Sequence, residues 1–374
     1  MIAAVVAEAE DAFDENALWA AHPLDESDGH LPSVTTLYLG ASGVVWTFHA
    51  LADAGLVDLQ RDWAPVAVGL AERYSSQPDF QDFVSGQVPS LLMGAAGVLL
   101  VAHSLAPAAW QEDELLAAVR ANADNPSLEL MWGSAGTMIA ARVMAERTGA
   151  EHWQQAWRDS ADELWAQWRS DLWEQDLYGK TVEYIGPAHG FAGNVLALAQ
   201  GDLLDAERRS ELERRAIATV TAYAERDGGL CQWPPVSEPF QRREQAIRTQ
   251  WCHGAPGMIA SLAGLALDDE QLTELLLEGG ELTWRAGPLK KGAGLCHGTA
   301  GNGYAFLKLL ERTGDELWLE RARAFAMHAA EQVEQARAEH GRGRHTLWTG
   351  DLGAALYLQD CIAGSTGFPT LDYF

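Results

Sequence analysis

The amino-acid sequence predicts an all-α fold, a seven-fold double α/α toroid in which an inner ring of helices is wrapped by an outer ring. Three observations support this prediction. A G-x-x-G pattern recurs seven times along the 374 residues, each copy opens a mostly apolar run of helical length, and amphipathic segments lie between the copies. The period-2 alternation that is typical of β-strands is absent.

The repeated motif marks the expected starts of the inner helices. Its seven copies are Gly40–Gly43, Gly94–Gly97, Gly133–Gly136, Gly190–Gly193, Gly254–Gly257, Gly298–Gly301 and Gly350–Gly353. Because glycine has no Cβ, it permits a tight turn and a close backbone approach at a helix start. The apolar runs that follow are typical of helices buried on most sides. We therefore expect one inner helix from each copy.

The segments between the motifs predict the outer ring. Asp315–Val333 and Ala206–Glu225 each carry apolar side chains on one helical face and charged side chains elsewhere. In such a toroid the loops before all seven motifs converge on one mouth. Asp227–Arg248, which contains two consecutive prolines, is expected to be a long excursion over that mouth. No boundary divides the chain, so we predict a single domain over residues 1–374.

The charge balance excludes some partners. Lys and Arg number 26 against 53 Asp and Glu, which gives a formal net charge of −27. A surface this acidic repels nucleic acid and anionic lipid. No stretch approaches the roughly 20 apolar residues of a transmembrane helix, and the acidic N-terminal stretch is not typical of a secretory signal. We expect a cytoplasmic protein whose four cysteines are reduced.

Cysteine and histidine stand before two of the motif glycines and predict a metal site. Cys252 lies two residues before Gly254, and Cys296 and His297 directly precede Gly298. Equivalent positions in two repeats bring these residues to the same mouth, where a helix N-terminus favours thiolates. Two thiolates and one imidazole suit Zn²⁺ and leave a fourth position open. The alternative is a pair of buried cysteines with unrelated histidines.

Two further histidines occupy matching positions. His253 follows Cys252 as His297 follows Cys296, so it could be a fourth ligand that closes the site. We favour a supporting role for His253 beside a three-ligand ion. His189 directly precedes the fourth motif and is predicted to reach the mouth as a general acid or base. The alternative for His189 is a structural role at the helix start.

These motifs resemble the lanthionine synthetase C-like family. The resemblance rests on W-C-H-G-A-P-G from residue 251, G-L-C-H-G-T-A-G-N-G-Y-A-F-L from residue 294, A-H-G-F-A-G from residue 188 and the seven repeats, from Gly40 to the C-terminal end. It implies a seven-fold double α-toroid and a zinc-dependent enzyme that adds a thiol to dehydroalanine or dehydrobutyrine. Bacterial members use a cysteine of the same peptide, and eukaryotic members add glutathione to dehydroamino acids in proteins.

The resemblance also implies roles for individual residues. It implies zinc ligation by Cys252, Cys296 and His297, proton transfer by His189, stabilisation of enolate charge by Arg248, and an acidic active-site residue at Glu129. His253, where bacterial cyclases tend to have tyrosine, resembles the glutathione-adding branch. Lys290 and Lys291 also match that branch, in which a lysine lies near the thiol substrate.

Other functions remain open at this point. The expected partners are a peptide or protein that contains a dehydroamino acid, and glutathione or a peptide cysteine. A dedicated lanthipeptide cyclase is the nearest alternative, and a non-catalytic binding protein stabilised by zinc is a second. A carbohydrate-active α/α toroid is disfavoured, because such enzymes use paired carboxylates rather than a Cys-Cys-His group.

Overall fold

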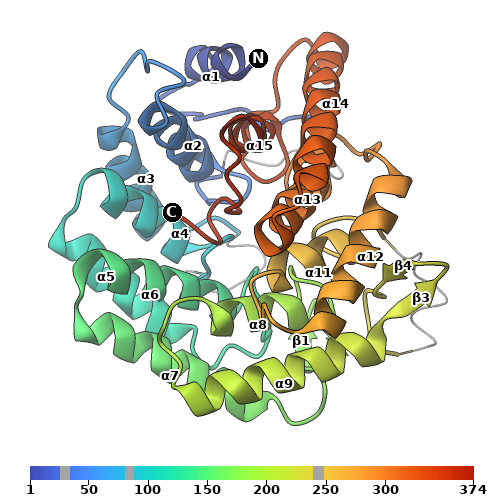
Figure 1. Ribbon diagram of the computed structural model, residues 1–374. Coiled ribbons are helices and arrows are strands. Elements are labelled where there is room, and N and C mark those ends of the chain that lie inside the picture. The colour runs from blue at the N-terminus through green and yellow to red at the C-terminus, as the bar shows by residue number, and fades with distance from the viewer. Residues whose placement is uncertain (26–33, 81–87, 239–247) are drawn as a thin grey trace.

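A computed structural model describes residues 1–25, 34–80, 88–238 and 248–374. Its inner ring consists of helices that start at the seven motifs, and the first glycine of each motif is the N-cap. These helices are α2 (Ala41–Asp53), α4 (Ala95–Leu105), α6 (Ser134–Thr148), α8 (Phe191–Ala199), α11 (Ala255–Leu262), α13 (Thr299–Thr313) and α15 (Asp351–Ala363). Each contacts the next, and α15 contacts α2, so the ring closes (Figure 1).

The outer ring consists of helices that pack against the inner ones (Figure 1). They are α1 (Ile2–Asp11), α3 (Ala64–Ser76), α5 (Ala109–Ala121), α7 (Glu151–Gln167), α9 (Ala206–Tyr223), α12 (Glu270–Ala286) and α14 (Glu316–His340). Aspartate side chains cap three of them by accepting backbone N–H bonds, those of α9, α12 and α14. The sequence predicted the double toroid correctly, and the segment predicted to end at Val333 continues to His340.

Helix α1 belongs to the outer ring, and the sequence analysis did not predict it. It packs against α15, the last inner helix, through buried side chains that include Val5, Val6 and Ala9. The chain therefore closes the outer ring with its first residues, while the inner ring closes through α15 and α2.

The second glycine of each motif is required by packing rather than by its backbone angles. A Cβ at that position would overlap with the carbonyl oxygen of the residue six positions earlier in the same loop. On its other side, the Cβ would lie 2.6–3.4 Å from the side chain of the matching residue in the preceding repeat. These matching residues form a buried ring, here called the collar: Leu37, Leu91, Leu130, Pro187, Trp251, Leu295 and Leu347.

The segment after α15 fills the end of the toroid opposite the motif glycines. Asp372 accepts hydrogen bonds from the Phe368 backbone N–H (2.7 Å) and from Gln200 (2.7 Å), and it pairs with Lys308 of α13 (2.8 Å). The Phe368 ring reaches inward to Tyr304, 4.7 Å between centroids, and to Trp251 of the collar, 5.5 Å. The C-terminus lies within the ring in Figure 1, so this segment packs against the collar from the side away from the motif glycines.

Two short hairpins depart from the purely helical prediction. Strands β1 (Gln175–Leu177) and β2 (Lys180–Val182) pair antiparallel, as do β3 (Glu225–Asp227) and β4 (Leu230–Gln232). Three-residue strands are too short to give a periodic signal, which is why the sequence did not predict them. The second hairpin begins the predicted excursion of 227–248, of which residues 239–247 lie outside the described part of the chain. Within the described ranges, no helix is long and apolar enough to cross a membrane.

Candidate metal and catalytic site

The residues two positions before each motif form the floor of the mouth. They are Tyr38, Leu92, Met131, Ala188, Cys252, Cys296 and Trp348. Backbone hydrogen bonds of 2.9–3.3 Å run between neighbouring repeats, among them those from Cys252 N to Cys296 O and from Cys296 N to Trp348 O. The two cysteines are therefore held side by side by the same contacts that order the other loops.

The structure brings Cys252, Cys296 and His297 together as the sequence predicted. One potential ligand atom from each lies within 4.8 Å of the others, so the three could hold a metal ion. Both cysteines are buried and His297 is half-buried. In the described part of the chain this group contains neither Cys231 nor Cys361, which are buried elsewhere and whose thiol pKa values are raised to about 12 by that burial.

The chemistry of the two thiols fits a divalent cation. The hydrogen bond from the Cys296 thiol holds the pKa of Cys252 well below its usual range. The same bond, together with burial, raises the pKa of Cys296. A cation bound by both sulfurs would hold them as thiolates. Two thiolates and one imidazole are a ligand set that zinc prefers, with a position left for a substrate.

Two polar residues support the thiols, and neither was singled out from the sequence. Gln250 donates from Nε2 to Cys252 Sγ at 2.8 Å, and the Tyr38 hydroxyl hydrogen-bonds the Cys296 thiol. Tyr38 stands two residues before its motif glycine, as both cysteines do. Aligning the repeats position by position would have identified Tyr38 from the sequence alone.

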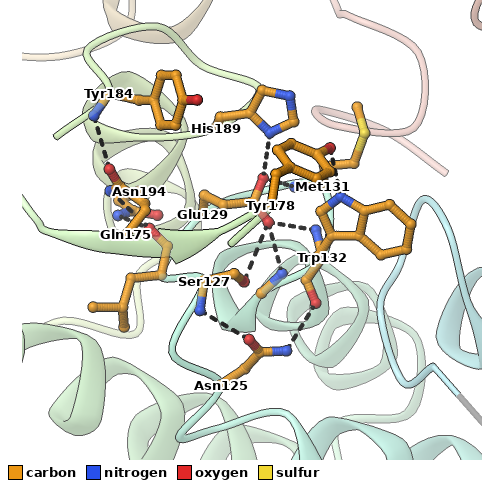
Figure 2. Close-up of polar contacts among 12 residues, drawn as sticks. Asn125, Ser127, Glu129, Met131, Trp132, Gln175, Tyr178, Tyr184, His189 and Asn194 are labelled. Atoms are coloured by element: carbon orange, nitrogen blue, oxygen red, sulfur yellow. Dashed lines mark hydrogen bonds and ion pairs between the residues drawn. The ribbon is translucent and has the colours of Figure 1, made fainter. Parts of the chain in front are cut away.

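Glu129, which is buried, and His189, which is half-buried, form a pair from neighbouring repeats (Figure 2). His189 Nδ1 lies 3.0 Å from Glu129 Oε2, and Glu129 is fully buried. The same carboxylate accepts backbone N–H bonds from Met131 (2.9 Å), Trp132 (2.5 Å) and Gly133 (3.0 Å) at the start of α6. These bonds fix the carboxylate, which in turn holds the His189 ring through Nδ1.

His253 lies between this pair and the metal-ligand group. Its ring centroid is 6.0 Å from that of His189 and 6.1 Å from that of Tyr184. Burial first, and then the positive charges of His189, Arg248 and Lys291, lower the pKa of His253 to about 4, so its ring is neutral at pH 7. The side chain is not among the described residues that make up the ligand group, and its Nδ1 has no hydrogen-bond partner.

The three basic residues predicted near the site differ in their contacts with it. Arg248 is exposed and close enough to His253 to lower its pKa. Lys291 donates from Nζ to Gln250 Oε1 at 3.4 Å, so Gln250 connects this lysine to the Cys252 thiol. Lys290 is exposed.

Comparison with known proteins places these features in a family. The model of the lanthionine synthetase C-like protein family matches residues 32–372. The chain is 37% identical over 147 residues to glutathione S-transferase LANCL1 of Danio rerio, covering 38% of this chain and 35% of that protein. It is 45% identical over 82 residues to LanC-like protein GCL1 of Arabidopsis thaliana, covering 21% of this chain and 19% of that one.

A solved structure gives the same fold. Nisin cyclase superposes with a TM-score of 0.65 over 95% of this chain and 92% of its own, at 18% sequence identity. The two curated relatives are matched over about a third and a fifth of their own lengths, whereas the family model extends over most of this chain. The chain belongs to the lanthionine synthetase C-like family.

Proposed function

We propose that this protein adds a thiol to dehydroalanine or dehydrobutyrine residues of a peptide or protein and forms a thioether. The observation that carries this proposal is the adjacency of two groups at one mouth. Cys252, Cys296 and His297 could hold a zinc ion, and His189, oriented by Glu129, lies one repeat away across His253. One group suits the binding of a thiol, and the other suits the delivery of a proton.

Bound zinc would hold the substrate thiol as a thiolate at neutral pH. The chain's own residues would complete the reaction. The sulfur lone pair forms a bond to the β-carbon, and the electrons of the C=C bond move through the α-carbon to the amide oxygen. Arg248, exposed beside His253, would stabilise the negative charge on that oxygen. His189 Nε2 would take the proton released by the thiol and return it to the α-carbon, while Glu129 holds Nδ1.

Two observations favour glutathione as the thiol. Lys291 and Arg248 bring positive charge close to the candidate ligand group, which suits a thiol that carries two carboxylates. The relative from Danio rerio also bears the name glutathione S-transferase. A cysteine of the acceptor peptide itself is the alternative donor, and it would make this protein a lanthipeptide cyclase.

The proposal is tested by incubating the zinc-loaded protein with a dehydroalanine-containing peptide and glutathione. We expect the peptide to gain the mass of one glutathione much faster than in a reaction without protein. A second peptide that carries its own cysteine tests the cyclase alternative, because ring closure removes the alkylatable thiol without a change in mass. If neither peptide reacts faster than the control, and if zinc removal unfolds the protein, the ion has a structural role only.

His189→Asn is expected to retain zinc and to slow thiol addition by about 100-fold or more, the usual loss for a general acid or base. Asparagine can still donate to Glu129, so the pair remains satisfied while the transferable proton is lost. Zinc content and turnover are measured on the same sample. His328→Asn, at an exposed site on α14, is the matched control and should change neither. Unchanged turnover in His189→Asn would show that His189 has a structural role and does not transfer a proton.

A further inference from the structure

The β1–β2 hairpin turn is built from an unfavourable residue. Its two central residues, Tyr178 and Gly179, have φ values of +55° and +70°. The β3–β4 hairpin has the same two-residue turn, with φ of +57° at Gly228 and +79° at Gly229. Turns with two positive φ angles favour glycine, asparagine or aspartate, and a bulky residue there is a genuine outlier. The turn of the β3–β4 hairpin is therefore the unstrained Gly-Gly, whereas the β1–β2 turn has a strained tyrosine at its first position.

The strained turn places the Tyr178 ring beside His189, as Figure 2 shows. Its ring meets His189 edge-on, with 5.6 Å between centroids and an interplanar angle of 85°. The Tyr178 hydroxyl accepts a hydrogen bond from Trp132 Nε1 at 3.0 Å, which fixes the direction of the side chain. Yet Tyr178 remains 62% exposed, so burial of its ring does not account for the strain. Strained residues of this kind cluster at functional sites.

Trp132 extends the same aromatic surface to a third loop. The Phe80 ring packs edge-on against Trp132, with 6.1 Å between centroids, and Phe80 also has a positive φ, +64°. Phe80, Trp132 and Tyr178 are here called the aromatic rim. The rim is tied to the catalytic pair, because the Trp132 backbone N–H donates to Glu129. A displacement of the rim would therefore act on the groups that orient His189.

We propose that Tyr178 is a specificity-determining residue, and that the aromatic rim binds an apolar side chain adjacent to the dehydroamino acid of the acceptor. This inference rests on the proposed function. Successive residues of an extended peptide lie about 3.3 Å apart, so a ring 5.6 Å from His189 is within two residues of the reacting α-carbon. The rim consists of aromatic residues without formal charge, and aromatic faces bind apolar and aromatic side chains. The acceptor is then an extended segment with a leucine- or phenylalanine-like neighbour.

The test uses binding, so that it does not depend on turnover. Fluorescently labelled peptides carry alanine in place of dehydroalanine and either phenylalanine or glycine beside it. We expect the parent protein to bind the phenylalanine peptide about ten-fold more tightly, and Tyr178→Asn to reduce that preference to roughly two-fold or less. Because asparagine suits this turn, the variant should unfold at the same temperature as the parent or higher. A loss of binding through misfolding is thereby excluded.

Gly228→Tyr in the sister hairpin is the matched control. It introduces the same strain away from His189, so it should lower the unfolding temperature and leave the peptide preference unchanged. With active protein, Tyr178→Asn should raise KM for the acceptor and leave KM for glutathione unaltered.

Two results would overturn the inference: equal binding of both peptides by the parent, or an unchanged preference in Tyr178→Asn. A clear preference in a protein that forms no adduct would instead refute the proposed thiol addition and leave a peptide-binding site.

Discussion

Cys252→Ala is expected to abolish stoichiometric zinc binding and thiol addition with it, while the helical content stays close to that of the parent. The substitution removes one of the three potential ligands found in the described part of the chain. Zinc affinity should therefore fall by more than about 100-fold, because removing a residue that only supports a ligand already costs up to that much. Helix α11 begins after Gly254, and its start does not depend on the Cys252 side chain. Competition with a chromophoric chelator and far-UV circular dichroism measure the two quantities.

Cys231→Ala provides the control for the loss of a buried thiol. Cys231 is as buried as Cys252 but lies outside the ligand group, so this variant should keep a full zinc complement. A full complement in Cys252→Ala would refute the ligand assignment. If both variants lost zinc together, the effect would come from folding rather than from coordination.

Gly301→Ala is expected to lower the free energy of unfolding by about 3 kcal/mol or more. This is at or above the usual upper limit of the cost of adding a methyl group to a well-packed core. A methyl group there would overlap with the Leu295 carbonyl oxygen and would also press on the Trp251 side chain, 3.2 Å away. Both neighbours belong to the collar, so neither can move without disturbing an adjoining loop. Denaturant unfolding, followed by tryptophan fluorescence, gives the free energy of unfolding.

Gly69→Ala is the matched substitution in an outer helix. Gly69 is exposed within α3, and a Cβ there would meet nothing within 4 Å. Alanine should stabilise the helix by about 0.5–1 kcal/mol, because it has less conformational freedom to lose on folding. Similar changes in the two variants would contradict the packing role of the motif glycine.

The repeat explains why so much of the fold could be predicted from the sequence. Glycine pairs before apolar runs fix where the inner helices start, and a shared start places residues as distant as Cys252 and Cys296 at one mouth. The repeat does not specify contacts between different positions. The hydrogen bond between Glu129 and His189, for example, depends on the paths of two different loops. A pattern found within one repeat cannot predict such a contact.

The elements that were missed carry weak local signals. The strands of the two hairpins have three residues each, and the Tyr178-Gly179 turn lacks the usual residue at its first position. Helix α1 has no side-chain cap and no motif glycine, so its tertiary contacts with α15 and α14, rather than a local signal, identify it as part of the outer ring. Gln250 was overlooked because an amide that supports a thiol has no distinctive spacing.

The collar has a consequence for the candidate metal site. Between the fifth and sixth loops the collar residue is Trp251, the bulkiest of the seven, and it sits where Gly301 lacks a side chain. Trp251 directly precedes Cys252, and its Cβ faces Gly301, which lies five residues beyond Cys296, while its ring packs against Trp348 and Phe368. The residue next to a candidate ligand thus packs against the sixth loop, the seventh loop and the C-terminal segment at once. Exchanging that one ring for a smaller side chain would leave a cavity beneath the candidate site while every candidate ligand is retained.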